Sequence, residues 1–138
     1  MNDFRAGASA GESERRHRDI EVYAAQFSQG PREIESEFIS RFGQAFADEA
    51  FEATGGTVWQ EGPLSRRETG LVVIGILSAL GGLESRLQGH VQWALDNGAT
   101  ADEIESVILV VSNYAGYPRS SVAMEVVRDT ITDKNKDV

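Results

Sequence analysis

Residues 63–98 read PLSRRETGLVVIGILSALGGLESRLQGHVQWALDNG, and this stretch decides the predicted fold. Ser65 and Glu68 form the pattern of a capping box, in which a hydroxyl and a carboxylate satisfy two backbone N–H groups at the start of a helix. Nearly every residue from 71 to 80 is apolar, so this helix is apolar around its whole circumference. A small chain has little interior in which to bury such a helix, and the stretch therefore indicates packing between subunits.

The glycines at 81–82 end the apolar helix, and a second helix that carries His90 and Trp93 ends at Asn97 and Gly98. Apolar residues at helical spacing predict four more helices, over residues 13–28, 31–53, 101–115 and 118–132. No stretch alternates between apolar and polar residues as a half-buried strand would. The sequence therefore predicts an all-α fold of six helices.

The chain of 138 residues is long enough for one hydrophobic core but short for two domains. Residues 1–12 are rich in small residues and are expected to form a flexible arm, and residues 133–138 a frayed tail. One helical domain is thus predicted over residues 13–132. Within it, the Thr-Gly-Gly run at 54–56 is expected to end a helix and to lead into a loop that holds Trp59.

The charge and cysteine content exclude several classes of function. The chain has 22 acidic and 13 basic residues, a formal net charge of −9, and this disfavours nucleic acid and anionic membranes as partners, which require a basic surface. Without cysteine it cannot form disulfides, thiol redox centres or zinc–thiolate sites. Its longest apolar run is about ten residues, whereas a membrane span needs roughly 20. The start lacks a basic-then-apolar signal pattern, so we expect a cytoplasmic protein.

Common catalytic patterns are absent from the sequence. It has no phosphate-binding loop, no dinucleotide-binding glycine pattern, no nucleophile elbow and no paired-histidine metal motif. Only two histidines occur, and His17 lies in a charged segment, so a histidine-rich metal site is not expected. The remaining candidates are polar or aromatic side chains beside apolar helices: His90, Glu68, Glu84, Arg66, Arg67, Arg119, Trp59 and Tyr114. Taken alone, these residues indicate a helical, oligomeric domain without naming a reaction.

Four blocks of sequence occur in a characteristic order: LSRRETGLVVIGILSALGG from Leu64, HVQWALDNG from His90, TADEIESV from Thr100 and YAGYP from Tyr114. Together they resemble the carboxymuconolactone decarboxylase family, which shares its helical fold with the alkylhydroperoxidase D group. The resemblance covers roughly residues 56–127. It implies a six-helix alkylhydroperoxidase D-like fold, and with the apolar helices it leads us to expect a homo-oligomer, either a trimer or a hexamer.

The resemblance also separates two branches of this superfamily. The peroxidase branch has a Cys-x-x-Cys pair just before the histidine, and those positions hold Leu83 and Arg86 here. The chain therefore resembles the cysteine-free decarboxylase branch and is not expected to be a peroxidase. That branch implies loss of CO₂ from a small carboxylated lactone or enone without metal or cofactor. Thr69 and Gln92 stand where such decarboxylases usually have arginine.

The implied chemistry needs a donor to the oxyanion that develops as CO₂ leaves, and an acid that protonates carbon. The resemblance indicates His90 for these roles, since imidazole can serve near neutral pH. Glu68 is a second catalytic candidate. An arginine would hold a substrate carboxylate through a bidentate contact. The candidates for substrate binding are Arg66, Arg67, Arg119, Trp59 and Tyr114.

Each candidate has a structural alternative. His90 can be a buried histidine or a subunit contact, and Glu68 fits a helix cap better than an acid–base group. Trp59 is by default a core or interface residue, and Tyr114 suits the core as well as a pocket. The function has alternatives too: a family member recruited for an isomerisation, cyclisation or ring-opening step, or a non-catalytic oligomeric scaffold. The expected partners are a small molecule and further copies of the chain, and neither nucleic acid nor membrane.

Overall fold

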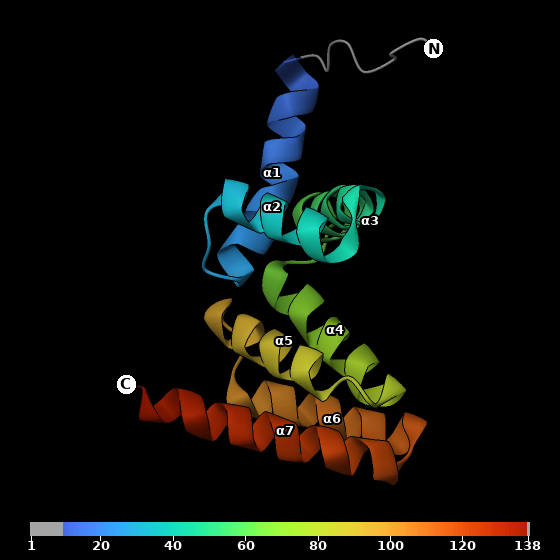
Figure 1. Cartoon of the computed structure of the whole chain (residues 1–138). Helices are drawn as coiled ribbons and strands as arrows, with labels where there is room; N and C mark the ends of the chain where they lie inside the picture. Colours follow the sequence, from blue (N-terminus) through green and yellow to red (C-terminus); the bar gives the residue numbers. More distant parts are fainter. Residues whose placement is uncertain (1–9, 138) are drawn as a thin grey trace. The chain divides into compact units, whose positions relative to one another are not determined.

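The computed structural model of the chain describes residues 10–137, which form seven α-helices and one π-helix without a β-strand. The all-α prediction is confirmed. The elements are α1 (Ala10–Gln26), α2 (Pro31–Phe42), α3 (Gln44–Glu49), the π-helix η1 (Ala50–Gln60), α4 (Arg66–Leu80), α5 (Glu84–Asp96), α6 (Ala101–Ala115) and α7 (Tyr117–Lys136) (Figure 1). In this described part, no helix combines the length and the apolar character that crossing a membrane requires.

The chain divides into two compact units, with the boundary between Pro63 and Leu64. The first has a core around Ile34 and Phe51, and the second has its own core, which includes Ile74. The single domain predicted over residues 13–132 stays a prediction, because a division by compactness does not show that either unit folds alone. Most of the predicted flexible arm lies outside the described residues, and its last three residues belong to α1.

The first unit departs from the predicted helices at two places. Gly43 has a φ of 85°, a left-handed conformation that separates α2 from α3, so the helix predicted over 31–53 is divided. The loop predicted after the Thr-Gly-Gly run at 54–56 is helical instead, because η1 continues to Gln60. The predicted count of six helices is therefore too low.

The glycine pair of η1 explains why the helix does not stop there. A Cβ atom on Gly55 would lie 2.4 Å from the backbone oxygen of Asp19 in α1, and one on Gly56 would lie 2.6 Å from the Asp19 Oδ1 atom. The pair thus serves the close approach of two helices and not a reversal of the chain. At the start of η1, the Tyr23 hydroxyl donates a hydrogen bond of 3.1 Å to the Ala50 carbonyl and strengthens the same contact.

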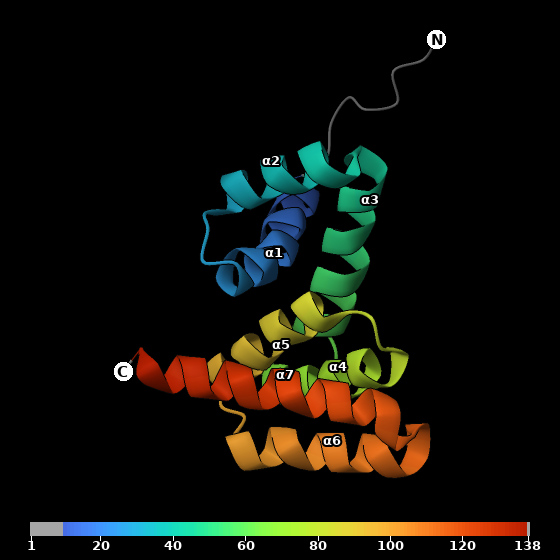
Figure 2. The same cartoon turned by 60° about the horizontal axis from the view of Figure 1, so that its bottom comes forward.

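The second unit consists of two antiparallel helix pairs. α5 runs back along α4, and α7 runs back along α6 (Figures 1 and 2). Further contacts of α4 with α6 and of α5 with α7 close a core in which Ile74, Val91 and Ile108 are buried. α4 and α5 approach closely at Gly70, where a Cβ atom would lie 3.3 Å from the Cβ of Ala94.

The boundaries of the second unit's helices follow the predicted signals. At the start of α4, the Ser65 hydroxyl accepts the Glu68 N–H at 3.1 Å and the Glu68 carboxylate accepts the Ser65 N–H at 2.7 Å, which confirms the capping box. Gly81 (φ 71°) and Gly116 (φ 107°) follow α4 and α6 in left-handed conformations. α7 continues to Lys136, beyond its predicted end at 132.

Glu103 joins the starts of two helices. Its Oε1 atom accepts hydrogen bonds from the Thr100 backbone N–H at 3.4 Å and from the Thr100 hydroxyl at 3.0 Å, within a second capping box at the start of α6. Its Oε2 atom forms an ion pair with Arg67, in the first turn of α4. One carboxylate thus caps α6, connects it to α4 and offsets a cation at the unfavourable end of a helix dipole.

Helix α4 is not buried around its whole circumference. Val72, Ile76 and Leu80 follow one another at intervals of four residues and are exposed by 51%, 52% and 59%. They form one apolar face of the helix, which we call the α4 stripe. An apolar face of this kind is suited to packing between subunits, and the predicted oligomer stays a prediction.

Candidate functional site

His90 lies in the middle of α5, and its side chain is half-buried with the Nδ1 atom covered. Burial lowers the pKa of His90 below its ordinary value, and the positive charge of Arg86 lowers this pKa further. Both effects favour the neutral imidazole at pH 7. A neutral imidazole has one N–H donor and one acceptor nitrogen. It can therefore donate a hydrogen bond to a developing negative charge near neutral pH.

Arg86 is a further candidate for the site, because its charge acts on His90. It stands four residues before His90 in α5, and side chains at this spacing are neighbours on one face of a helix. This spacing is the signal that could have identified it. Its guanidinium can attract an anionic ligand to the face of α5 that carries His90.

Arg66 is brought to the same region of α5 by an aromatic contact. Its guanidinium carbon lies over the ring of Trp93, 5.8 Å from the ring centroid. Trp93 is buried and stands three residues after His90, which makes the two side chains neighbours on α5. Of the three arginines predicted to bind substrate, Arg66 is the one whose contact leads to the His90 helix.

The other two predicted arginines have partners elsewhere. Arg67 pairs with Glu103. The Arg119 guanidinium donates a hydrogen bond of 3.1 Å to the Ala79 carbonyl in the last turn of α4. Because a helix rises about 1.5 Å per residue, Arg119 acts about 20 Å from the end of α4 that carries Arg66. The structure does not bring the three arginines together around one small ligand, and the binding roles of Arg67 and Arg119 stay predictions.

The remaining predicted site residues also lie apart from His90 in the chain. The Glu68 carboxylate caps α4, and the hydrogen bond from the Ser65 backbone N–H lowers its pKa. Tyr114 is 90% exposed near the end of α6. Trp59 is buried in η1 of the first unit. The catalytic role of Glu68 and the binding roles of Tyr114 and Trp59 stay predictions.

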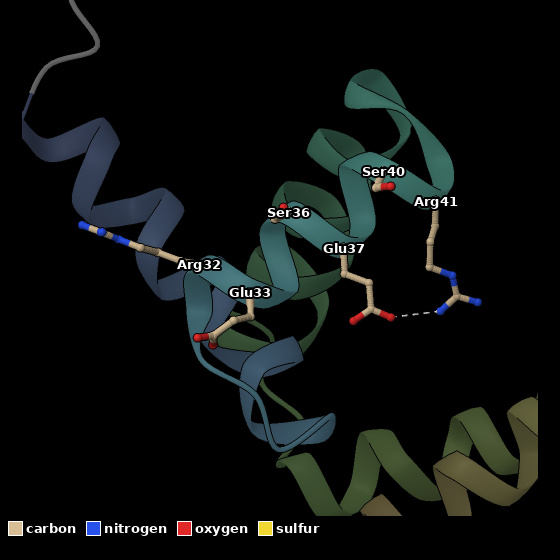
Figure 3. Close-up of a pocket in the computed structure, with 6 residues that line it drawn as sticks. All are labelled: Arg32, Glu33, Ser36, Glu37, Ser40 and Arg41. Atoms are coloured by element: carbon tan, nitrogen blue, oxygen red, sulfur yellow. Dashed lines mark hydrogen bonds and ion pairs between the residues drawn. The ribbon is translucent and has the colours of Figure 1, made fainter.

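Three hollows can be described within the separate units, and His90 does not line any of these three. A groove of about 540 Å³ follows the polar face of α2, where Arg41 donates a hydrogen bond of 3.3 Å to Glu37 (Figure 3). Equal numbers of arginines and glutamates line this groove, so their charges cancel. A hollow of about 320 Å³ lies between α6 and α7, over the hydrogen-bonded hydroxyls of Ser112 and Ser120. A cavity of about 10 Å³ lies at the turn after α4.

Comparison with known proteins identifies the family. Residues 45–129 match the model of the Carboxymuconolactone decarboxylase family, and this range includes His90, Arg86, Arg66 and Trp93. The chain belongs to the carboxymuconolactone decarboxylase family. The matched range begins within α3 and ends within α7, so in this family member α1 and α2 lie outside the match.

Two proteins named as decarboxylases are similar to this family member. The 4-carboxymuconolactone decarboxylase of Acinetobacter baylyi is 36% identical over 97 residues, which cover 70% of this chain and 72% of that protein. The nitrosuccinic acid decarboxylase of Metarhizium robertsii is 38% identical over 79 residues, which cover 56% of this chain and 54% of that protein. The family and these relatives support a decarboxylase-like enzyme, as the resemblance implied.

Proposed function

We propose that this protein is a cofactor-independent decarboxylase that acts on a small carboxylated lactone or enone. The observation that carries the proposal is the environment of His90, a half-buried imidazole whose pKa is lowered by burial and by Arg86. This imidazole shares a face of α5 with Trp93, which holds the guanidinium of Arg66. The names of the two relatives support the same class of reaction.

His90 acts on the charge that decarboxylation creates. When the bond to the carboxylate carbon breaks, CO₂ leaves and the electron pair moves into the conjugated carbonyl, which becomes an enolate. The neutral His90 N–H donates a hydrogen bond to the enolate oxygen. This bond strengthens as negative charge builds, so it stabilises the transition state more than the bound substrate. A water molecule then protonates carbon and leaves hydroxide.

An arginine orients the substrate by holding a carboxylate that does not leave. A strong grip on the departing carboxylate would stabilise the ground state as well and would gain nothing. Arg86 stands about one turn before His90, and the guanidinium of Arg66 lies over Trp93, about one turn after it. Either cation can supply such a contact.

We also propose that the chain works in the cytoplasm as a trimer or hexamer, without metal or redox cofactor, and that it is not a peroxidase. Support for the assembly comes from the α4 stripe, which a further copy could cover. Among residues 10–137, no three histidine, aspartate or glutamate side chains gather to hold a metal ion. The lack of cysteine argues against thiol peroxidase chemistry.

The test is turnover of 4-carboxymuconolactone and of nitrosuccinate, followed by release of CO₂ before and after exhaustive chelation. We expect chelation to leave the rate unchanged and His90→Leu, which removes the N–H donor, to lower kcat by about 10²–10³-fold, the usual effect of removing one oxyanion donor. His17→Leu is the matched control, because the side chain of this second histidine is 62% exposed in α1. Light scattering on the same samples monitors assembly.

A fully active His90→Leu variant would mean that His90 is structural and that the proposed site is wrong. Absence of turnover with both acids would contradict the decarboxylase and favour the alternatives, a recruited isomerisation, cyclisation or ring-opening step or a non-catalytic scaffold. A rate lost on chelation and restored by one metal would contradict the cofactor-independent reaction.

A further inference from the structure

We propose that Trp93 is a positioning residue, which holds the Arg66 guanidinium as the carboxylate anchor of the His90 site. The inference rests on the proposed function and goes beyond it by choosing the arginine and naming the side chain that orients it. Trp93 itself does not touch the reacting atoms in this scheme. It acts through Arg66.

Arg66 differs from the other predicted anchors in what its guanidinium does. Arg67 is paired with Glu103, and Arg119 donates to Ala79 at the far end of α4. Among the described residues of the second unit, 64–137, no acidic side chain lies within ion-pair distance of Arg66. Its N–H groups therefore remain available to an anionic ligand.

The packing of α4 on α5 explains why Arg66 reaches Trp93. Gly70 stands four residues after Arg66 on the same face of α4, and the absence of its side chain lets this face approach Ala94, the next residue after Trp93. The backbone of Arg66 thus lies one helical turn before the point where Gly70 of α4 approaches Ala94 of α5. Its side chain lies over the indole ring at 5.8 Å, within the range of a cation–π contact.

An arginine held on an aromatic ring suits carboxylate recognition. A cation–π contact uses none of the N–H groups of the guanidinium, so these groups can still bind a carboxylate through a bidentate contact. Trp93 is 6% exposed, so its ring is a fixed support. Because Trp93 and His90 are neighbours on α5, a carboxylate held by Arg66 keeps the rest of a small ligand beside the imidazole.

The experiment compares Arg66→Gln, Trp93→Met, Trp93→Phe and the double variant Arg66→Gln/Trp93→Met. The measurements are kcat and KM for the turned-over acid, and the Kd of succinate, a dicarboxylate probe, by calorimetry. Arg66→Gln should raise KM and Kd by about 10- to 100-fold with kcat nearly unchanged, as expected for lost charge-assisted hydrogen bonds. Trp93→Met should raise KM and the Kd of succinate by about two- to fivefold. Trp93→Phe keeps an aromatic ring, so its KM and Kd should be close to those of the wild type.

The double variant should bind no more weakly than Arg66→Gln, since Trp93 acts only through that arginine. Arg128→Gln is the matched control, because it removes an exposed arginine of the same unit that pairs with Glu105. Neutral succinamide should not compete with succinate. Thermal unfolding of each variant monitors the fold, and Trp93→Phe with Arg66→Gln completes the comparison if Trp93→Met does not fold.

The outcomes separate this inference from the proposed function. Turnover that depends on His90 but not on Arg66 or Trp93 would contradict the role of Arg66 as carboxylate anchor. It would not contradict the proposed decarboxylase function. Absence of turnover together with succinate binding that follows the expected pattern would support the anchor and contradict the decarboxylase. The positioning role would be overturned if the two substitutions had additive effects on Kd in the double variant. It would also be overturned if Trp93→Met had the same KM and Kd as the wild type. Absence of both turnover and binding would overturn both proposals.

Discussion

Gly55 contacts Asp19 so closely that a Cβ atom added to the glycine would lie 2.4 Å from the Asp19 backbone oxygen. A backbone atom in a packed helix cannot move aside cheaply, so α1 can pack on η1 only while position 55 has no side chain.

Gly55→Ala should therefore destabilise the protein by about 1–3 kcal/mol, the usual cost of overpacking. The control is Gly89→Ala, since a Cβ atom there would meet nothing within 4 Å. This helical substitution should stabilise by about 1 kcal/mol. Chemical unfolding monitored by circular dichroism measures both. A Gly55→Ala variant as stable as wild type would contradict the contact between α1 and η1.

Burial raises the pKa of Asp19, and this outweighs the opposing effects of Arg15 and Arg18. As pH rises from about 3.8, its ordinary pKa, the unfolded chain ionises Asp19 before the folded chain does, and the fold loses stability until the raised pKa is passed. Asp19→Asn should thus be more stable than wild type at pH 7 and equal to it near pH 3. Unfolding curves at both values test this, and a variant less stable at pH 7 would contradict it.

The lowered pKa of His90 makes the fold less stable as pH falls, whereas the raised pKa of Asp19 makes it less stable as pH rises. When pH falls through 6.5, the unfolded chain protonates His90 while the folded chain keeps it neutral, so the fold loses stability toward acid. His90→Gln should remove this part of the pH dependence between pH 7 and the lowered pKa. An NMR titration in a His17→Gln background, where one imidazole remains, measures the pKa itself. A value at or above 6.5 would contradict the neutral donor.

Ile76 lies at the centre of the α4 stripe and is 52% exposed. If the stripe packs against a further copy, Ile76→Glu should convert a trimer or hexamer of the 15.0 kDa chain into smaller species in light scattering, because obligate interfaces exclude unpaired charge. Gln88→Glu adds the same charge at an exposed position of α5 and should leave the assembly intact. A wild-type chain that remains a 15.0 kDa monomer at micromolar concentration would contradict the assembly.

The parts of the fold that depend on neighbouring residues could be predicted from the sequence. The capping box at Ser65 and the glycines at 81–82 act within one turn of the chain, and the structure confirms the boundaries they indicated. The glycines at 55 and 56 were misassigned because their role is tertiary. These glycines allow α1 to pack closely on η1. In the sequence, a glycine pair with this role looks the same as a glycine pair that ends a helix.

The candidate site also combines residues that local patterns indicate with residues that only the packing of helices brings together. The family blocks indicated His90, and the spacing of Arg86 would have added a second residue. The contact of Arg66 with Trp93 and the pairing of Arg67 with Glu103 join residues on different helices. Two adjacent arginines look equivalent in the sequence. The helix packing decides which of them is neutralised and which faces the ring.

The double use of Glu103 bears on the order of folding. Its contacts with Thr100 span three residues and can form as soon as the first turn of α6 exists, whereas the ion pair with Arg67 requires closure of a long loop. A carboxylate already held by the local contacts has lost its rotamer freedom before Arg67 arrives, so the late contact costs less entropy. An early nucleus at the start of α6 would thus prepare the point at which α4 joins it.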